Sequence, residues 1–233
     1  HDVEIQHLEL KEQIDLHYIK AKGQGGDYYF ENIKINNLDD GYSILTKGEL
    51  NRISVDKLLY EFDDFEQTYI NSNQIKGEIS SAFKASFFIN PSKSFDLKSL
   101  TFNSDNSFQH VKLIDYNYIA EIVDYFDESM ITRNIVDIPY YKQKSKKIIF
   151  KPFRNNMSFK DGKLNISPTY LENNMLNLNL KGTQTISDSV DYYMSFNWKE
   201  IKKRNKKEKE DYLEEKEEIK ELFLRIEKSS ALY

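Results

Sequence analysis

The sequence predicts an α+β fold, mostly β, in which a long, twisted, groove-like antiparallel sheet carries two packed amphipathic helices. Residues 190–198 alternate between apolar and polar side chains, a period of two that is typical of a strand with one buried and one wet face. Asp-Gly pairs at 40–41 and 161–162 favour two-residue hairpin turns between antiparallel strands. Apolar residues recur at helical spacing in 54–66 and 115–127.

The N-terminal third is predicted to form hairpins that lead into the first helix. Residues 3–20 alternate imperfectly and form one or two strands. The glycines at 23–26 lack the G-x-G-x-x-G spacing of a phosphate-binding turn, so we interpret them as a loop or bulge. Strands on both sides of Asp39-Asp40-Gly41 form the next hairpin. Ser54 is the expected N-cap of the helix at 54–66.

The middle of the chain continues the sheet and adds the second helix. Residues 75–90 form one long strand or a pair, and the strand at 95–104 follows. Asp115 is the expected cap of the helix at 115–127. Residues 138–153 are predicted to be an exposed basic loop that leads into an edge strand, because two prolines bracket a basic patch at Lys142, Lys144, Lys146 and Lys147.

The C-terminal part has the clearest strand signals. A hairpin is predicted at Asp161-Gly162, and the alternation at 176–181 and 190–198 places the apolar residues of both strands on one face. The residues predicted to face lipid or to form the core are Leu176, Leu178, Leu180, Val190, Tyr192, Met194, Phe196 and Trp198. The simpler interpretation of this apolar stripe is a sheet face covered by the two helices.

A strongly charged segment follows the last of these strands. Residues 199–209 hold seven basic and two acidic residues, and residues 210–221 hold seven acidic and two basic ones. We expect a solvated or partner-bridging helix over about 199–219, and a strand at 222–227. The chain therefore divides into a β-rich domain at 1–201, a charged helical or linker segment at 202–221, and a closing strand and tail at 222–233.

Composition argues against several classes of function. A net charge of -5 gives no general electrostatic basis for binding nucleic acid. The chain has no cysteine, which excludes disulfides and thiolate chemistry. The four histidines are scattered in the sequence, and no spacing indicates a metal site. The acidic clusters at 63–64 and 124–128 are expected to be solvated faces of helices. We therefore predict a protein that is not an enzyme and uses no metal or cofactor.

Three blocks of sequence, in order, resemble the C-terminal region of AsmA-like proteins of the Bacteroidota type. The first two are 58–70 with 75–77, and 111–126. The third block is a hairpin, a strand that ends in Gly-Thr, and a strand that contains Asp-Tyr. Its matching residues are Asp161, Gly162, Ile166, Pro168, Gly182, Thr183, Asp191 and Tyr192. The blocks cover roughly residues 40–201, and Glu66 stands where the family usually has Gly.

The resemblance implies an elongated groove with an apolar interior, on the periplasmic side of a bacterial envelope. In larger relatives this groove is thought to conduct phospholipid between membranes. The chain begins at His1-Asp2, with neither Met nor an apolar leader, so we expect a processed form or a piece of a longer protein. The expected inner-membrane anchor would then precede His1.

The leading hypothesis is a non-enzymatic envelope protein that binds or transfers lipid, or assists outer-membrane assembly. Its expected ligands are phospholipid or lipopolysaccharide. The residues predicted to contact anionic headgroups are Lys142, Lys144, Lys146, Lys147, Lys202, Lys203 and Arg204. One alternative is a structural module that docks an envelope protein through a sheet edge and the charged segment. The other is a surface carbohydrate-binding or adhesin domain that uses exposed tyrosines at 28–29 and 140–141.

Overall fold

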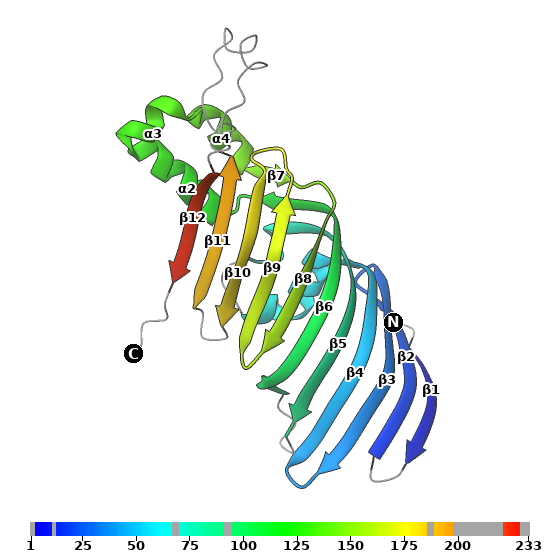
Figure 1. Cartoon of the computed structure of the whole chain (residues 1–233). Helices are drawn as coiled ribbons and strands as arrows, with labels where there is room; N and C mark the ends of the chain where they lie inside the picture. The colour runs from blue at the N-terminus through cyan, green and yellow to red at the C-terminus, as the bar shows by residue number, and fades with distance from the viewer. Residues whose placement is uncertain are drawn as a thin grey trace.

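The computed structural model describes residues 3–10, 13–66, 70–90, 95–185, 189–197 and 221–228, and the strands in these ranges form one open, twisted antiparallel sheet (Figure 1). The N-terminal strands are β1 (Val3–Leu10), β2 (Gln13–Gly23), β3 (Gly26–Leu38), β4 (Gly41–Ser54), β5 (Ile75–Ile89) and β6 (Phe95–Ile114). The C-terminal strands are β7 (Lys147–Ile149), β8 (Phe153–Lys160), β9 (Lys163–Leu171), β10 (Leu178–Thr185), β11 (Val190–Asn197) and β12 (Glu221–Lys228).

The main path of the sheet follows chain order. Each strand pairs with its predecessor and its successor, except that β8 follows β6 directly and the short β7 pairs with β6 outside this path. Strands β1 and β12 therefore lie at opposite edges (Figure 1). The predicted fold class, mostly β with a long twisted antiparallel sheet, is confirmed.

The hairpin turns follow the sequence signals closely. Asp161 and Gly162 have φ values of 52° and 71° and join Lys160 to its partner Lys163, as a type I′ turn requires. The second predicted hairpin is also present, but its turn residues are not the Asp-Gly pair. Leu38 pairs with Gly41, so the turn lies one residue earlier, at 39–40.

Strand pairing gives the sheet one apolar and one polar face, because residues directly opposite each other on antiparallel strands share a face. One row of partners, the apolar row, crosses every strand of the main path and contains one polar residue, Ser104. The apolar row is Ile5, Ile19, Phe30, Gly48, Phe83, Ser104, Met157, Ile166, Gly182, Tyr192 and Ile226.

The chain neighbour of each of these residues belongs to a second row on the opposite face. This polar row is Gln6, Tyr18, Glu31, Lys47, Lys84, Asn103, Ser158, Asn165, Thr183, Asp191 and Glu227. A step of one residue along any strand therefore moves from the apolar to the polar face. This is the alternation of period two that the sequence shows most clearly at its C-terminal end.

Both predicted helices form, with different bounds. The helix expected at 54–66 is α1 (Val55–Glu61) followed by a separate 3-10 turn, η1 (Asp63–Glu66). Asp63 and Asp64 have φ values of 50° and 52°, which α-helical geometry does not allow. The predicted apolar stripe packs only in part, because Leu59 is buried whereas Phe62 is 55% exposed.

The second predicted helix is α2 (Asn117–Glu128), and its N-cap residue is Tyr116 rather than Asp115. Asp115 has a φ of 46°, so its backbone belongs to the tight turn that leaves β6. Val123 and Phe126 of the predicted stripe are buried. A short helix that the sequence did not predict, α3 (Met130–Ile135), follows directly.

The prediction of an exposed basic loop at 138–153 is wrong. These residues begin with helix α4 (Ile138–Ser145), continue through β7 and enter β8. Pro139 lies in the first turn of α4, where a missing N–H costs nothing, and the Asp137 carboxylate accepts a hydrogen bond from the Tyr140 N–H. Ile138, Tyr141 and Ser145 are buried at helical spacing, so the lysines occupy only the outer side of an element with its own core face.

The three helices α2, α3 and α4 gather at one end of the sheet, beside the ends of β11 and β12 (Figure 1). Buried residues of α2 and α4, and Val136 between α3 and α4, form one cluster with Phe196 of β11. The cluster consists of Val123, Phe126, Val136, Ile138, Tyr141 and Phe196, with Ile122, Met175, Leu176 and Leu178 packed against it. No helix in the described part of the chain is long and apolar enough to cross a membrane.

Candidate functional site

The apolar face of the sheet is the principal candidate site. Next to the apolar row, aromatic rings meet across the strands. Phe102 and Phe159 lie stacked with ring centroids 5.9 Å apart, and Phe108 and Phe153 lie stacked at 4.7 Å. These four rings come from the paired strands β6 and β8, at the middle of the sheet. The face therefore gathers aromatic and aliphatic side chains across the middle of the sheet.

Two glycines in the apolar row lie beneath aromatic rings of the next strand. A Cβ atom on Gly48 would lie 2.4 Å from the ring of its partner Phe83. A Cβ on Gly182 would lie 2.3 Å from the Tyr192 ring and 2.5 Å from the Asp191 carbonyl oxygen. A side chain at Gly48 would therefore meet an aromatic ring, and a side chain at Gly182 would meet both a ring and backbone.

The predicted apolar residues occupy the C-terminal end of this face. Val190, Met194 and Phe196 are 3%, 9% and 4% exposed, and Tyr192 covers Gly182. Leu178 and Leu180 pair with Phe196 and Met194, so the predicted alternation is confirmed for the described residues. Leu176 precedes β10 and packs against the helical cluster. Trp198 and the helix expected at 199–219 lie outside the described residues.

The helical cluster closes this end of the face. Phe196 belongs to the core that α2 and α4 cover. The simpler interpretation of the stripe expected cover from the helices at 54–66 and 115–127, and only the second of these, α2, contributes to this cluster. Tyr116 lies near Tyr192 of β11, and burial, together with the nearby hydroxyls of Tyr118 and Tyr192, raises the pKa of Tyr116 to about 12. The chain segment that leaves β6 therefore approaches β11, although β8, β9 and β10 lie between them in the sheet.

The predicted headgroup lysines gather around α4 and β7, and acidic residues accompany them. The Nζ of Lys142 lies 2.7 Å from Asp127 and 3.4 Å from Asp124. The hydrogen bond from Lys142 lowers the pKa of the Asp127 carboxyl. Lys144 lies over the Tyr140 ring at 5.7 Å. Lys146 and Lys147 are exposed, whereas 202–204 lie outside the described residues. A headgroup role for these lysines stays a prediction.

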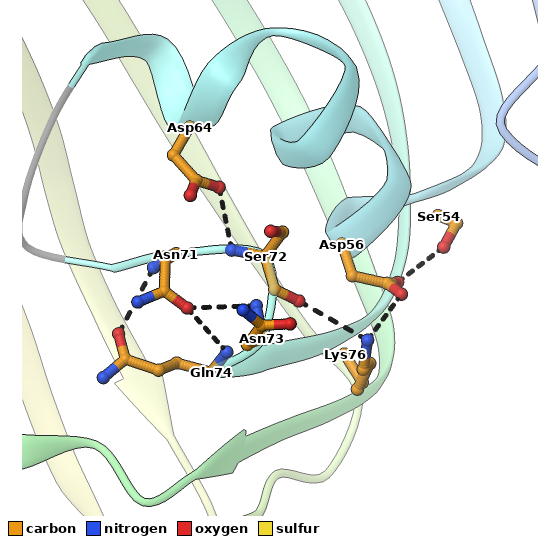
Figure 2. A network of polar contacts seen from close by, with 8 residues as sticks. All are labelled: Ser54, Asp56, Asp64, Asn71, Ser72, Asn73, Gln74 and Lys76. Carbon is orange, nitrogen blue, oxygen red and sulfur yellow. Dashed lines mark hydrogen bonds and ion pairs between the residues drawn. The ribbon is translucent and has the colours of Figure 1, made fainter.

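A polar network holds α1 and the segment 70–74 against β5 (Figure 2). The Nζ of Lys76 donates to the Asp56 carboxylate at 2.8 Å and to the Ser72 carbonyl at 3.4 Å. Ser54 is the N-cap residue of α1, as predicted, but its hydroxyl donates to Asp56 at 2.6 Å and forms no capping hydrogen bond with the helix backbone. The Asp64 carboxylate accepts from the Ser72 N–H at 2.8 Å. These contacts hold the connection between β4 and β5 in place, and the side chains of Asp56, Asp64 and Lys76 are each engaged in one of them.

This network predicts a measurable dependence of stability on pH. Burial raises the pKa of Asp56, but the hydrogen bonds from Lys76 and Ser54 lower it by more. In the folded protein the pKa of the Asp56 carboxyl therefore lies below the ordinary value of about 3.9. The ionised Asp56 carboxylate therefore contributes its full stabilisation of the fold when the pH is above that ordinary pKa. This contribution is lost as the pH falls through the lowered pKa of the folded protein's Asp56. Asp56→Asn should be less stable than the wild type at pH 7, and urea unfolding should show the difference shrinking below about pH 4. A difference that stays constant would contradict this.

The polar face has a shallow hollow of about 540 Å³, lined by charged, amide and hydroxyl side chains of the polar row and its neighbours. The one aromatic residue at its boundary, Phe83, belongs to the apolar row.

The tyrosines proposed for carbohydrate binding are not together on this face. Tyr141 is 4% exposed, inside the helical cluster, so the expectation that it is exposed is wrong. Tyr28 is partly buried and donates a hydrogen bond to Gln24.

Among the described residues, no group of three His, Asp or Glu side chains is placed to hold a metal ion. Comparison with known proteins gives no match: no family model, curated protein or solved structure is significantly similar to this chain. The resemblance to AsmA-like proteins therefore stays a prediction.

Proposed function

We propose that this chain binds the acyl chains of lipid along the apolar face of its sheet, as a non-enzymatic protein of a bacterial envelope. The observation that carries the proposal is the apolar row, which runs without a charged residue across every strand of the main path. Ten strand spacings of about 4.8 Å give the row a length of about 48 Å. A single membrane leaflet has a hydrocarbon thickness of about 15 Å, so the row exceeds the length of one acyl chain.

The two faces explain why lipid is the preferred ligand class. A globular core needs a second layer over its apolar side, yet the helices of the described part cover the sheet only near α1 and at the C-terminal end. The polar face opposite is charged and hydrated. A sheet of this kind separates a hydrocarbon ligand from water, and it needs no catalytic group to do so.

An alternative is that the sheet edges dock an envelope protein. Among the described strands, β1 and β12 each pair on one side only, and an unpaired strand edge is a template for strand addition. This function predicts binding that depends on the edge strands and does not depend on the middle of the apolar face.

The test compares the same substitution on the two faces. Met157→Lys places a charge in the apolar row, and Ser158→Lys places it one residue away in the polar row. Purified protein would be incubated with diacyl phospholipid vesicles, re-isolated and extracted with organic solvent for mass spectrometry. Wild type and Ser158→Lys should retain lipid, and Met157→Lys should lose most of it while its circular dichroism spectrum stays folded. Absence of lipid from the wild type, or equal retention by both variants, would contradict the proposal.

A further inference from the structure

A short polar row interrupts the middle of the apolar face. Ser81 of β5, Asn106 of β6 and Asn155 of β8 are direct partners in register. All three are buried, with exposed fractions of 8%, 5% and 9%. The stacked pair of Phe108 and Phe153 flanks the row on one side. On its other side lie Ser104 and Met157, and beyond them the stacked pair of Phe102 and Phe159. Polar groups in such surroundings are costly unless they form hydrogen bonds.

The hydrogen bonds within this polar row leave part of its capacity unused. The Asn106 Nδ2 donates to the Asn155 Oδ1 at 3.1 Å and to the Ser104 Oγ at 3.0 Å. A primary amide has two N–H donors, and the Asn155 Nδ2 donates to no protein group in the described part of the chain. The Ser81 hydroxyl likewise has no protein partner there.

These donors are not sealed inside the sheet. Among the described residues, every side-chain nitrogen or oxygen that is fully shielded from solvent has a hydrogen-bond partner. The Asn155 Nδ2 and the Ser81 Oγ therefore reach the surface of the apolar face, although the residues to which they belong are more than nine-tenths buried. Two hydrogen-bond donors open onto an otherwise apolar surface, and they stand on either side of Asn106.

We propose that Ser81, Asn106 and Asn155 form a subsite for the acyl carbonyl groups of a bound lipid. This inference rests on the proposed function and adds a chemical preference to it. Hydrocarbon lies against the phenylalanine rings, and a carbonyl oxygen accepts from Asn155 Nδ2 or Ser81 Oγ. Two strand spacings, about 10 Å, separate Ser81 from Asn155, so the row has room for more than one carbonyl. A ligand without an acceptor leaves both donors without a partner once it displaces water.

The experiment compares two soluble short-chain phospholipids that differ only in linkage. The first has ester-linked acyl chains, and the second has ether-linked alkyl chains of the same length and headgroup. Affinity would be measured by displacement of a fluorescent fatty acid from wild type, Asn155→Leu, Ser81→Ala and Asn156→Leu. Asn156 is the matched control, because it is the next residue of β8 and its amide contacts Asp105 on the polar face. Detergent-dispersed lipid A in a parallel arm distinguishes lipopolysaccharide from phospholipid as the source of the carbonyl.

The wild type should bind the ester about tenfold more tightly than the ether, the effect of one well-placed hydrogen bond. Asn155→Leu should remove this preference by weakening ester binding alone, and Asn156→Leu should retain it. Ser81→Ala, a smaller change, should reduce the preference and covers the case in which Asn155→Leu fails to fold. Equal wild-type affinity for ester and ether, or a preference that survives both Asn155→Leu and Ser81→Ala, overturns the subsite and leaves the proposed function standing. Failure to bind either lipid overturns both.

Discussion

Phe196→Asp is expected to lower the free energy of unfolding by at least about 4 kcal/mol, the largest effect of any substitution considered. Phe196 is 4% exposed and lies in the cluster formed with α2 and α4. The substitution removes an aromatic ring that two layers share, and it places an unpaired carboxylate among apolar groups. Urea unfolding at neutral pH, followed by circular dichroism, measures the loss.

The control for this prediction is Ser195→Asp, one residue earlier on the polar side of β11. Ser195 pairs with Asn179, so the carboxylate of the variant would stand opposite an uncharged residue. Ser195→Asp should therefore change stability by no more than about 0.5 kcal/mol, as surface substitutions usually do. Similar losses for the two variants would mean that the assignment of faces at β11 is wrong.

Gly182→Ala is expected to destabilise the protein by about 2–3 kcal/mol, at the upper end of the cost of overpacking. The added Cβ would lie 2.5 Å from the Asp191 carbonyl oxygen and 2.8 Å from the Tyr192 Cα, and neither atom can move without shifting β11. Thermal unfolding monitored by circular dichroism is a suitable measurement.

Gly48→Ala is the matched comparison. The Cβ of an alanine at this position would meet only the ring of Phe83, which can turn aside, whereas the Cβ at Gly182 meets backbone. We expect a loss of no more than about 1 kcal/mol for Gly48→Ala, because a flexible side chain relaxes more easily than a paired strand. A larger loss at Gly48 than at Gly182 would contradict the view that the backbone of β11 restricts Gly182.

The sequence predicted the sheet well where alternation is strict and turns have a strong signature. At β11, every second residue from Val190 is apolar, and at Asp161-Gly162 the two residues favour positive φ. Both patterns depend on neighbouring residues alone, so they can be read without knowledge of the rest of the chain. The same local rule indicated β5 and the strand character of 222–227, but it predicted a strand only at 95–104, whereas β6 continues to Ile114.

The middle of the candidate site could not be predicted in the same way. In β6, Phe102 and Phe108 are separated on the apolar face by Ser104 and Asn106, so local alternation suggests a polar strand. The apolar row becomes visible only when Ser104 is placed between Phe83 and Met157 by strand pairing. The signal that could have indicated it is the spacing of the two phenylalanines, because an even separation along a strand places both on one face.

Helix α4 was missed for a different physical reason. Lysine-rich sequence between two prolines resembles a loop, yet proline is accepted in the first helical turn and lysine propagates a helix well. The buried residues of α4 make contacts with Phe196 and α2 that are distant in sequence. Tertiary packing therefore determined the structure of this segment, and local propensity alone could not.

Site-specific photo-crosslinking tests the central claim, that lipid occupies the apolar face, most directly. The photo-reactive residue p-benzoylphenylalanine would replace either Phe83, in the apolar row, or Lys84, in the polar row, and each protein would be irradiated with radiolabelled diacyl phospholipid vesicles. We predict strong labelling from position 83 and little from position 84, although the two positions are adjacent in the chain. Equal labelling from both positions, or labelling from position 84 alone, would contradict the account.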